Sequence, residues 1–222
     1  MGWLRRVFEY IALRLESLLG PVIYGMTRLL APSGLPQKTF EQLYRHPDPW
    51  HYATSTYEQA KQNRALELVG NENPSRVLEI GCAEGVFSEK LAAHGIGSQI
   101  VGIDISTRAI ARARERCARF GHVEFRSANI LTESPGGMFD LIFIMEILYY
   151  MGRDLRAVCT RLAPALGDGC KVFLMHPAGE AHLHRSFQDL LGLTLVSEQL
   201  VKDNPRPYLV TILQRTSRAA SP

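Results

Sequence analysis

The sequence predicts an α/β fold in which a doubly wound, mostly parallel seven-stranded sheet ends in an antiparallel hairpin. Strand-like and helix-like stretches alternate along the chain from about residue 57. The first five strand-like runs are apolar at consecutive positions, which indicates strands that are covered by helices on both faces. Only a short polar segment separates the last two runs, so they have no room for a crossover helix and must pair antiparallel.

The elements follow one another in the order that such a sheet requires. A first helix is expected from Tyr57 to Val69, with Ser55 or Thr56 as its N-cap and Gly70 at its end. Further helices are expected at 86–93, 107–120, 154–166 and 182–191. The strands are expected at 76–81, 98–104, 123–128, 139–145, 171–176, 193–201 and 208–215.

A Pro- and Gly-rich stretch at 31–37 predicts a linker, so we expect a helical extension over 1–38, one globular domain over 39–215 and a loose tail over 216–222. Charged residues interrupt the extension, which therefore lacks the apolar run of a membrane span or a signal peptide. Two interpretations stay open: the helix packs on the domain or a second subunit, or it rests on an anionic membrane through its arginines. One apolar face is expected to hold Leu4, Val7, Phe8, Ile11, Leu15, Leu18 and Val22.

Composition narrows the classes of protein. The chain has 222 residues, 46% of them hydrophobic, which is enough for one sizeable core. Its net charge of +3 is spread among interleaved acids and bases, so no nucleic-acid partner is expected. The four cysteines are far apart, which favours a reduced, cytoplasmic protein without a disulfide framework. His182 and His184 are expected to be an exposed pair that do not face one another, so no metal site is predicted.

The stretch "VLEIGCAEG" at 77–85 indicates a ligand site at the end of the first strand. Gly81 and Gly85 allow a tight turn and leave room for a ligand against bare backbone. In an open α/β sheet, ligands bind beyond the carboxyl ends of the strands. The spacing is GxxxG rather than GxGxxG, which favours a nucleoside without a pyrophosphate and leaves NAD or FAD as the outside alternative.

Two further strand ends carry polar residues that suit a nucleoside. Asp104 ends the second strand, where a carboxylate accepts hydrogen bonds from both hydroxyls of a ribose. Asn129 follows the third strand, where its oxygen can accept from the amino group of an adenine. Ile105 and Ile130 are then expected to sandwich the base. Either polar residue alone could be a loop cap, but their occurrence on successive strand ends favours a nucleoside site.

Several motifs resemble those of class I S-adenosylmethionine-dependent methyltransferases: "VLEIGCAEGVFSEKLA", "VGIDISTRAIARARER" and "FDLIFIMEILYYM". The segment "DPWHYATSTYEQAKQNRAL", followed by "EILYYM", is similar to the rhizobial nodulation N-methyltransferase (NodS-like) family, which methylates the free amine of a deacetylated chitooligosaccharide. The resemblance covers about Asp48 to Arg215. It implies a methyltransferase that uses S-adenosylmethionine and releases S-adenosylhomocysteine.

The resemblance also implies roles for individual residues. Asp104 takes the ribose, and Asn129, with Ile130, takes the adenine. Lys61 is the expected partner of the methionine carboxylate. Asn129 stands where an acid is commoner, which is a mild change because an amide oxygen still accepts, and about 40 residues precede the motifs, which could alter partners or location. The expected cofactor-binding residues are Trp50, Tyr57, Lys61, Glu79, Gly81, Cys82, Ala83, Gly85, Asp104, Ile105, Asn129, Ile130 and Met145.

Three residues are candidates for the catalytic rim: Glu146, Tyr149 and His176. An amine acceptor must be neutral and needs a carboxylate or carbonyl to hold it, whereas a hydroxyl acceptor needs a real base. Structural alternatives remain for each candidate: Glu146 caps the following helix, His176 is a hydrogen-bonded strand-end residue, and Tyr149 or Tyr150 belongs to the core.

The favoured function is transfer of a methyl group to an amine or hydroxyl of a saccharide or small glycosylated metabolite. The alternatives are a natural-product or lipid-headgroup O-methyltransferase, a non-catalytic S-adenosylmethionine-binding module, and a NAD-dependent oxidoreductase.

Overall fold

The computed structural model describes residues 36–70, 72–151, 154–202 and 206–216, and every structural statement below concerns these. The predicted extension at 1–38 and the tail at 216–222 lie almost entirely outside them, so a second-subunit or membrane contact through the extension stays a prediction. The predicted cytoplasmic location also stays a prediction. Among the described residues, none of the helices has the length and apolar content to cross a bilayer.

The described strands form one seven-stranded sheet with the order β3-β2-β1-β4-β5-β7-β6. Neighbouring strands from β3 to β5 are parallel, whereas β7 is antiparallel to both β5 and β6. The predicted fold class is therefore confirmed, including its antiparallel end. The strands are β1 (Arg76–Ile80), β2 (Gln99–Asp104), β3 (Val123–Ser127), β4 (Phe139–Met145), β5 (Leu166–Pro177), β6 (Thr194–Val201) and β7 (Tyr208–Gln214).

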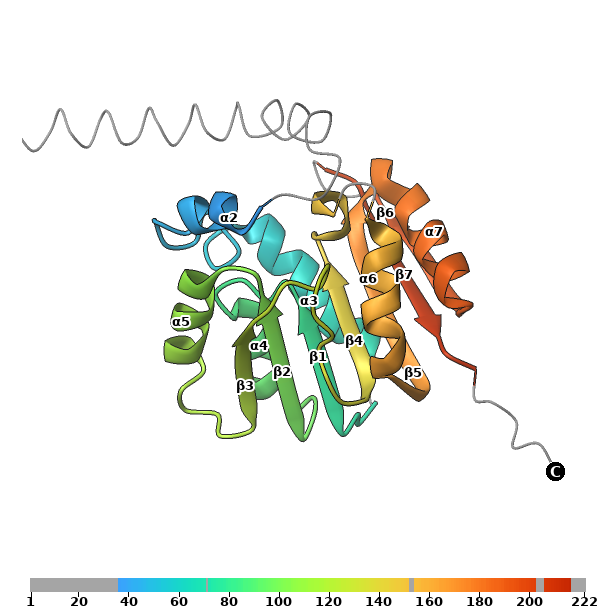
Figure 1. Ribbon diagram of the computed structural model, residues 1–222, viewed down its shortest axis with the longest axis horizontal. Helices are drawn as coiled ribbons and strands as arrows, with labels where there is room; N and C mark the ends of the chain where they lie inside the picture. The colour runs from blue at the N-terminus through green and yellow to red at the C-terminus, as the bar shows by residue number, and fades with distance from the viewer. Residues whose placement is uncertain (1–35, 71, 152–153, 203–205, 217–222) are drawn as a thin grey trace, which may run out of the picture.

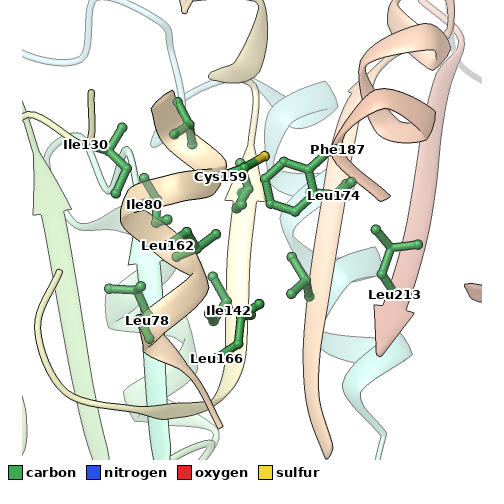
Figure 2. Close-up of a cluster of buried hydrophobic side chains, with 14 of the residues drawn as sticks. Leu78, Ile80, Ile130, Ile142, Cys159, Leu162, Leu166, Leu174, Phe187 and Leu213 are labelled. Carbon is green, nitrogen blue, oxygen red and sulfur yellow. The ribbon is translucent and has the colours of Figure 1, made fainter. Parts of the chain in front are cut away.

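Helices cover both faces of the sheet, which explains why its central strands are apolar at consecutive positions. On one face, α6 and α7 pack against the sheet, and Figure 2 shows Leu162 and Phe187 of these helices beside Leu78, Ile142 and Leu174. On the other face, α3 and α4 pack against a second cluster, and they lie behind the strands in Figure 1. The helices are α2 (Gln37–Leu43), α3 (Thr56–Val69), α4 (Val86–Ala93), α5 (Thr107–Arg116), α6 (Leu155–Leu162) and α7 (Ala181–Leu191).

The helix α3 begins at Thr56, one residue before the predicted Tyr57, and ends at the predicted Val69; of the two predicted N-caps, Ser55 is the observed one. The hydroxyl oxygen of Ser55 accepts a hydrogen bond from the backbone N–H of Glu58 at 3.5 Å, and Gly70 ends the helix at φ +60°. Its buried face changes along its length: Ala65 and Val69 are apolar, whereas the first turns bury polar side chains. A polar face that is buried points to a site rather than to a core.

Three other boundaries differ from the prediction by four or more residues. The helix expected over 107–120 ends at Arg116. The helix expected over 154–166 ends at Leu162, because Pro164 lies in a short 3-10 turn, Ala163–Ala165, and cannot donate an α-helical hydrogen bond. The strand β5 therefore begins at Leu166, five residues before the predicted start at 171. The short helix α2 begins at Gln37, the last residue of the predicted linker, and was not expected; it lies beyond the carboxyl ends of the strands in Figure 1.

The strand order reverses between β1 and β4, which are hydrogen-bonded neighbours in the middle of the sheet. From β1 the chain moves to one side through β2 and β3, and from β4 it moves to the other side through β5. Helices on opposite faces therefore leave a crevice at the carboxyl ends of these two strands, which is where ligands bind in sheets of this kind.

Candidate active site

Two adjoining cavities open at the carboxyl ends of β1 and β4, with volumes of about 520 and 690 Å³ including the space open to solvent. They share a wall made by Tyr52, Ile80, Gly81, Ala83 and Glu146. The larger, which we name the apolar cavity, is lined among others by Tyr44, Trp50, Ile103, Asp104, Ile105, Asn129, Ile130, Ile147 and Met151. The smaller, which we name the acidic cavity, is lined among others by Glu58, Lys61, Gln62, Glu79, Cys82, Met145 and Met175.

The glycine turn after β1 makes room for protein atoms as well as for a ligand. Gly81 and Gly85 have φ of +77° and +74°, so both need the left-handed conformation that glycine adopts freely. A Cβ on Gly81 would overlap the side chain of Ile147, and a Cβ on Gly85 would lie 3.0 Å from the Cβ of Ala113. Gly81 still lines both cavities, but Gly85 lines neither. Gly85 therefore clears space for α5, and its contact with a ligand stays a prediction.

Asp104 ends β2 inside the apolar cavity, with 8% of its surface exposed. One carboxylate oxygen accepts a hydrogen bond from the N–H of Ala83 at 3.0 Å, and the other accepts from the N–H of Ser106 at 2.8 Å. Burial raises the pKa of Asp104 to about 6, against the pull of these two backbone donors. Each oxygen keeps acceptor capacity for a further donor, which is what two ribose hydroxyls require.

Asn129 lies on the wall of the apolar cavity beside Ile105 and Ile130. Its side-chain oxygen accepts a hydrogen bond from the N–H of Leu131 at 3.0 Å, so the residue also shapes its own loop. The loop-cap alternative is therefore realised, and the adenine contact stays a prediction that relies on the second lone pair of the same oxygen.

Lys61 joins two carboxylates in the acidic cavity. Its ammonium lies 3.2 Å from Oε2 of Glu58 and forms an ion pair with Oε1 of Glu146. Burial alone would lower the pKa of Lys61, but the Glu146 and Glu58 carboxylates outweigh it and raise that pKa. Lys61 is therefore charged and engaged by protein acids, and a ligand carboxylate would have to compete with them.

Glu79 adds a third acid to this cavity. Its side chain is 5% exposed and accepts a hydrogen bond from the hydroxyl of Ser88. Burial raises the pKa of Glu79 to about 8, so the carboxyl is mostly protonated at neutral pH. Burial also raises the pKa of Glu58, against the opposing pull of Lys61. A cationic ligand in this cavity would relieve both carboxylates.

Glu146 occupies the wall between the cavities in an unusual backbone conformation. Its φ is +58°, in the left-handed region that non-glycine residues seldom adopt. Its backbone N–H donates to the carbonyl of Met175 at 2.9 Å. Tyr149 donates its hydroxyl to Oε2 of Glu146 at 2.8 Å, while Oε1 pairs with Lys61. The short 3-10 turn that follows, Leu148–Tyr150, has no side-chain cap, so the expected alternative of a helix-capping glutamate does not hold.

The two aromatic residues among the expected cofactor-binding residues, Trp50 and Tyr57, lie in different places. Trp50 lines the apolar cavity, and its ring centre lies 5.9 Å from that of Tyr150. Tyr57 lines neither cavity; it donates its hydroxyl to the carbonyl of Arg206 at 2.8 Å, and its ring centre is 5.3 Å from the Lys61 ammonium. The tyrosine on the shared wall is instead Tyr52, which the sequence analysis did not single out.

The structure does not bring His176 to the rim. The side chain is fully buried and lines neither cavity, and its Nε2 accepts from the backbone N–H groups of Ile147 at 3.3 Å and Leu148 at 3.2 Å. The predicted catalytic contact is thus corrected to the strand-end alternative. His184 was expected to be exposed, but it is 1% exposed because this face of α7 packs on the sheet; His182 is exposed. Among the described residues, no cluster of His, Cys, Asp and Glu could hold a metal ion.

Fold and site together define a class I S-adenosylmethionine-dependent methyltransferase domain: the sheet has a reversed order at β1 and β4, an acid ends β2 in an apolar cavity, and carboxylates line the neighbouring cavity. The family model of Nodulation protein S (NodS) matches residues 37–177, so the chain belongs to the NodS family. The predicted resemblance is confirmed.

Curated and solved relatives agree with this assignment. Nodulation protein S of Sinorhizobium fredii is 37% identical over 114 residues, which cover 51% of this chain and 51% of the relative. The ubiquinone biosynthesis O-methyltransferase of Aromatoleum aromaticum is 31% identical over 134 residues, which cover 59% of this chain and 53% of the relative. The chain thus spans about half the length of the curated relatives it matches. The crystal structure of the N-methyltransferase NodS from Bradyrhizobium japonicum WM9 in complex with S-adenosylhomocysteine has a TM-score of 0.70 and 27% identity, and the match covers 80% of this chain and 97% of that one.

Proposed function

We propose that the chain transfers a methyl group from S-adenosylmethionine to an amine of a saccharide or of a small glycosylated metabolite. The observation that carries the proposal is the position of Glu146, whose carboxylate lies on the wall shared by the two cavities. The N-methyltransferase activity of the solved NodS relative supports an amine as acceptor. A hydroxyl acceptor is the alternative, and the ubiquinone O-methyltransferase relatives support it.

The residues present fit this cofactor. Asp104 would hold the ribose, and the apolar walls at Ile105 and Ile130 would hold the adenine. Glu79 would face the amino group of the methionine half, because a buried carboxyl with a raised pKa gains most from a cationic neighbour. Lys61 would bind the carboxylate of that half if it exchanged one of its present acids for it. Both cavities are within the size range of small-molecule sites.

When bound, S-adenosylmethionine supplies an electrophilic methyl group on a sulfonium and leaves as S-adenosylhomocysteine. The chain supplies alignment and a charged wall, which are the main needs of an in-line displacement. Glu146 would accept a hydrogen bond from the acceptor amine and hold its lone pair toward the cofactor. Because the nitrogen gains positive charge as the new bond forms, this hydrogen bond strengthens in the transition state and is worth more there than in the ground state.

The described residues favour an amine over a hydroxyl. A hydroxyl needs a general base near neutral pKa, and no histidine among the described residues lines either cavity. Glu79, whose pKa burial raises to about 8, lines the acidic cavity, but in this proposal it faces the amino group of the cofactor and is not available as that base. Burial raises the pKa of Tyr149 well above its usual value, and the Glu146 carboxylate raises it further, so this tyrosine is a donor rather than a base. An amine loses its extra proton to solvent before it binds and needs only a hydrogen-bond acceptor.

The proposal is tested by methyl transfer from labelled S-adenosylmethionine to a deacetylated chitooligosaccharide, with the fully N-acetylated oligosaccharide as the matched control. The expected result is label on the free amine and none on the acetylated control. Label on both would favour a hydroxyl acceptor, and absence of label from both would reject a saccharide amine. Calorimetric titration with S-adenosylhomocysteine separates these outcomes from a failure to bind the cofactor, which would reject every enzymatic interpretation.

Glu146→Gln tests the role of the carboxylate in the same assay. The amide keeps the shape and one acceptor oxygen but loses the charge, so turnover should fall by about tenfold or more, corresponding to one charge-assisted hydrogen bond of roughly 1.5–3 kcal/mol. Affinity for S-adenosylhomocysteine should stay within about threefold of wild type. Wild-type turnover in this variant would remove Glu146 from the reaction.

A further inference from the structure

A continuous chain of side-chain hydrogen bonds runs from the turn after β4 to the edge strand β6. Nδ1 of His176 lies 2.8 Å from Nε2 of His184, and Nδ1 of His184 lies 2.7 Å from the hydroxyl oxygen of Thr211. That hydroxyl donates to Oε2 of Glu198 at 3.3 Å. The two histidines and the threonine are at most 2% exposed, whereas Glu198 is exposed on β6.

The backbone donors at one end of this hydrogen-bond chain and the accepting carboxylate of Glu198 at the other fix the position of each proton between them. Nε2 of His176 faces two backbone N–H groups, so it must be the unprotonated acceptor. The proton of His176 is therefore on Nδ1 and is donated to Nε2 of His184. His184 in turn carries its proton on Nδ1 and donates it to Thr211, whose own proton goes to Glu198. Every bond in the chain points away from the turn.

Both histidines must be neutral for this arrangement, and their surroundings keep them so. Burial lowers the pKa of His176 well below its usual range, and burial lowers that of His184 to about 4. A protonated His176 would present N–H to the backbone N–H groups that it now accepts from. A histidine held neutral with both ring nitrogens engaged has no lone pair left for a substrate proton.

The turn that this hydrogen-bond chain holds is the one that carries Glu146. Three successive backbone donors, at residues 146, 147 and 148, all find acceptors at the end of β5: the first meets the carbonyl of Met175, and the next two meet His176. Glu146 itself is at φ +58°, a conformation that persists only where surrounding contacts enforce it. Without Nε2 of His176, the N–H of Leu148, a buried residue, would lose its acceptor.

We propose that His176 is a positioning residue for methyl transfer: its Nε2 holds the turn that presents Glu146, and His184, Thr211 and Glu198 fix the tautomer that makes this possible. The expected effect of His176 on turnover rests on the proposed function, whereas its role in holding the turn does not. A merely structural histidine would contribute to stability and leave the turnover of folded enzyme unchanged, whereas a positioning residue must alter it.

The first test reads the tautomers directly in the full chain labelled with ¹⁵N-histidine. The chain has seven histidines, and His176→Gln and His184→Gln assign the two signals. We expect both residues to be neutral with the proton on Nδ1, although free imidazole favours the other nitrogen. A proton on Nε2 of His176, or a cationic ring at pH 7, would overturn the proposal.

The second test measures hydrogen exchange of the Ile147 and Leu148 amides. These amides should exchange at least about tenfold faster in His176→Leu than in wild type, and His176→Gln should restore protection because its amide oxygen reaches the position of Nε2. If His176→Leu does not fold, Thr211→Val removes the acceptor of His184 at constant shape, with Thr211→Ser as the matched control that keeps the hydroxyl. Unchanged protection in whichever of the two variants folds would overturn the proposal.

The third test separates positioning from stability. With a deacetylated chitooligosaccharide as acceptor, kcat of folded His176→Leu should fall by about tenfold and return toward wild type in His176→Gln. An unchanged kcat with a lower melting temperature would assign the histidine a structural role only. If wild type itself transfers no methyl group, the proposed function fails, while the tautomer and exchange measurements still decide whether His176 holds the turn.

Discussion

Asp104 should make the affinity for S-adenosylhomocysteine depend on pH below about 6. Burial raises the pKa of this carboxyl from 3.8 to about 6 in the free chain. Ribose hydroxyls donate to the ionised form, so binding lowers this pKa and the dissociation constant must rise as pH falls through 6. At pH 5 about nine in ten Asp104 side chains are protonated, so the protonation of Asp104 alone should make affinity about tenfold weaker than at pH 7.5. Calorimetric titration between pH 5 and pH 7.5 measures how the dissociation constant changes with pH.

Asp104→Asn removes the titration but keeps one acceptor oxygen. The affinity of this variant at pH 7.5 should be about tenfold weaker than that of wild type, because charge-assisted hydrogen bonds are roughly twice as strong as neutral ones. Toward pH 5 its affinity should weaken only by what the protonation of Glu79 contributes. Asp189→Asn, on the exposed face of α7, is the matched control and should behave as wild type. A wild-type affinity that stays constant from pH 7.5 to 5, or an Asn variant that keeps the wild-type slope, would refute the assignment of Asp104 to the ribose.

Three further substitutions test the site and the fold. Glu79→Gln should stabilise the chain above neutral pH. The pKa of the wild-type carboxyl rises from 4.5 to about 8 on folding, so this group contributes stability that is fully present below pH 4.5 and is lost as pH rises through 8. The loss amounts to up to roughly 5 kcal/mol, at about 1.4 kcal/mol per pH unit. Urea unfolding at pH 5 and 8.5 measures this change in the free energy of unfolding. If Glu79 ionised normally, the change between the two pH values would be the same in wild type and variant. Gly81→Ala should cost about 2–3 kcal/mol of stability and lower turnover, because its Cβ overlaps Ile147. Gly95→Ala is the control: it is also at positive φ, but its Cβ would have nothing within 4 Å, so it should cost only about 1 kcal/mol. Equal losses of stability in the two variants would contradict the contact with Ile147. Ser55→Ala should cost about 1 kcal/mol of stability through the lost N-cap of α3, measured as a lower melting temperature that Ser55→Asp restores.

The sheet was predictable because its signal is local. Consecutive apolar residues in β1 and β4 require two covered faces, and that requirement holds whatever the neighbours are. The end of α6 was not predicted correctly, although Pro164 in "RLAPAL" is itself a sequence signal that ends a helix near the preceding residues. The early start of β5 depends on pairing with Phe139 of β4, a contact that no local pattern records.

The position of Asp104 followed from the strand ends, whereas the contacts of Lys61 and the burial of His176 did not. Asp104 could be placed because the end of a parallel strand has a known position relative to its neighbours. The environment of Lys61 could not be placed, although the sequence carries a signal for it. Glu58, Lys61 and Gln62 lie at helical spacing from the buried Ala65, so they belong to a polar face that is turned inward. The burial of His176 and His184 depends on the packing of α7 against β5 and β7, which sequence spacing alone does not fix.

Glu146 links these observations to the chemistry. A glycine at this φ would remove strain of about 1 kcal/mol or more, so the side chain itself must be worth that cost. Glu58 and Glu79 line the same cavity: Glu58 pairs with Lys61 and Arg206, whereas Glu79 is mostly protonated in the free chain. A cationic ligand beside Glu79 would favour its ionised form, so the cavity is suited to such a ligand. Methylation of an amine does not remove positive charge but moves it to the acceptor nitrogen. In the proposed reaction, a carboxylate on the wall between the two cavities is in the position to favour that movement, and the turn after β4, which is hydrogen-bonded to the end of β5, holds it there.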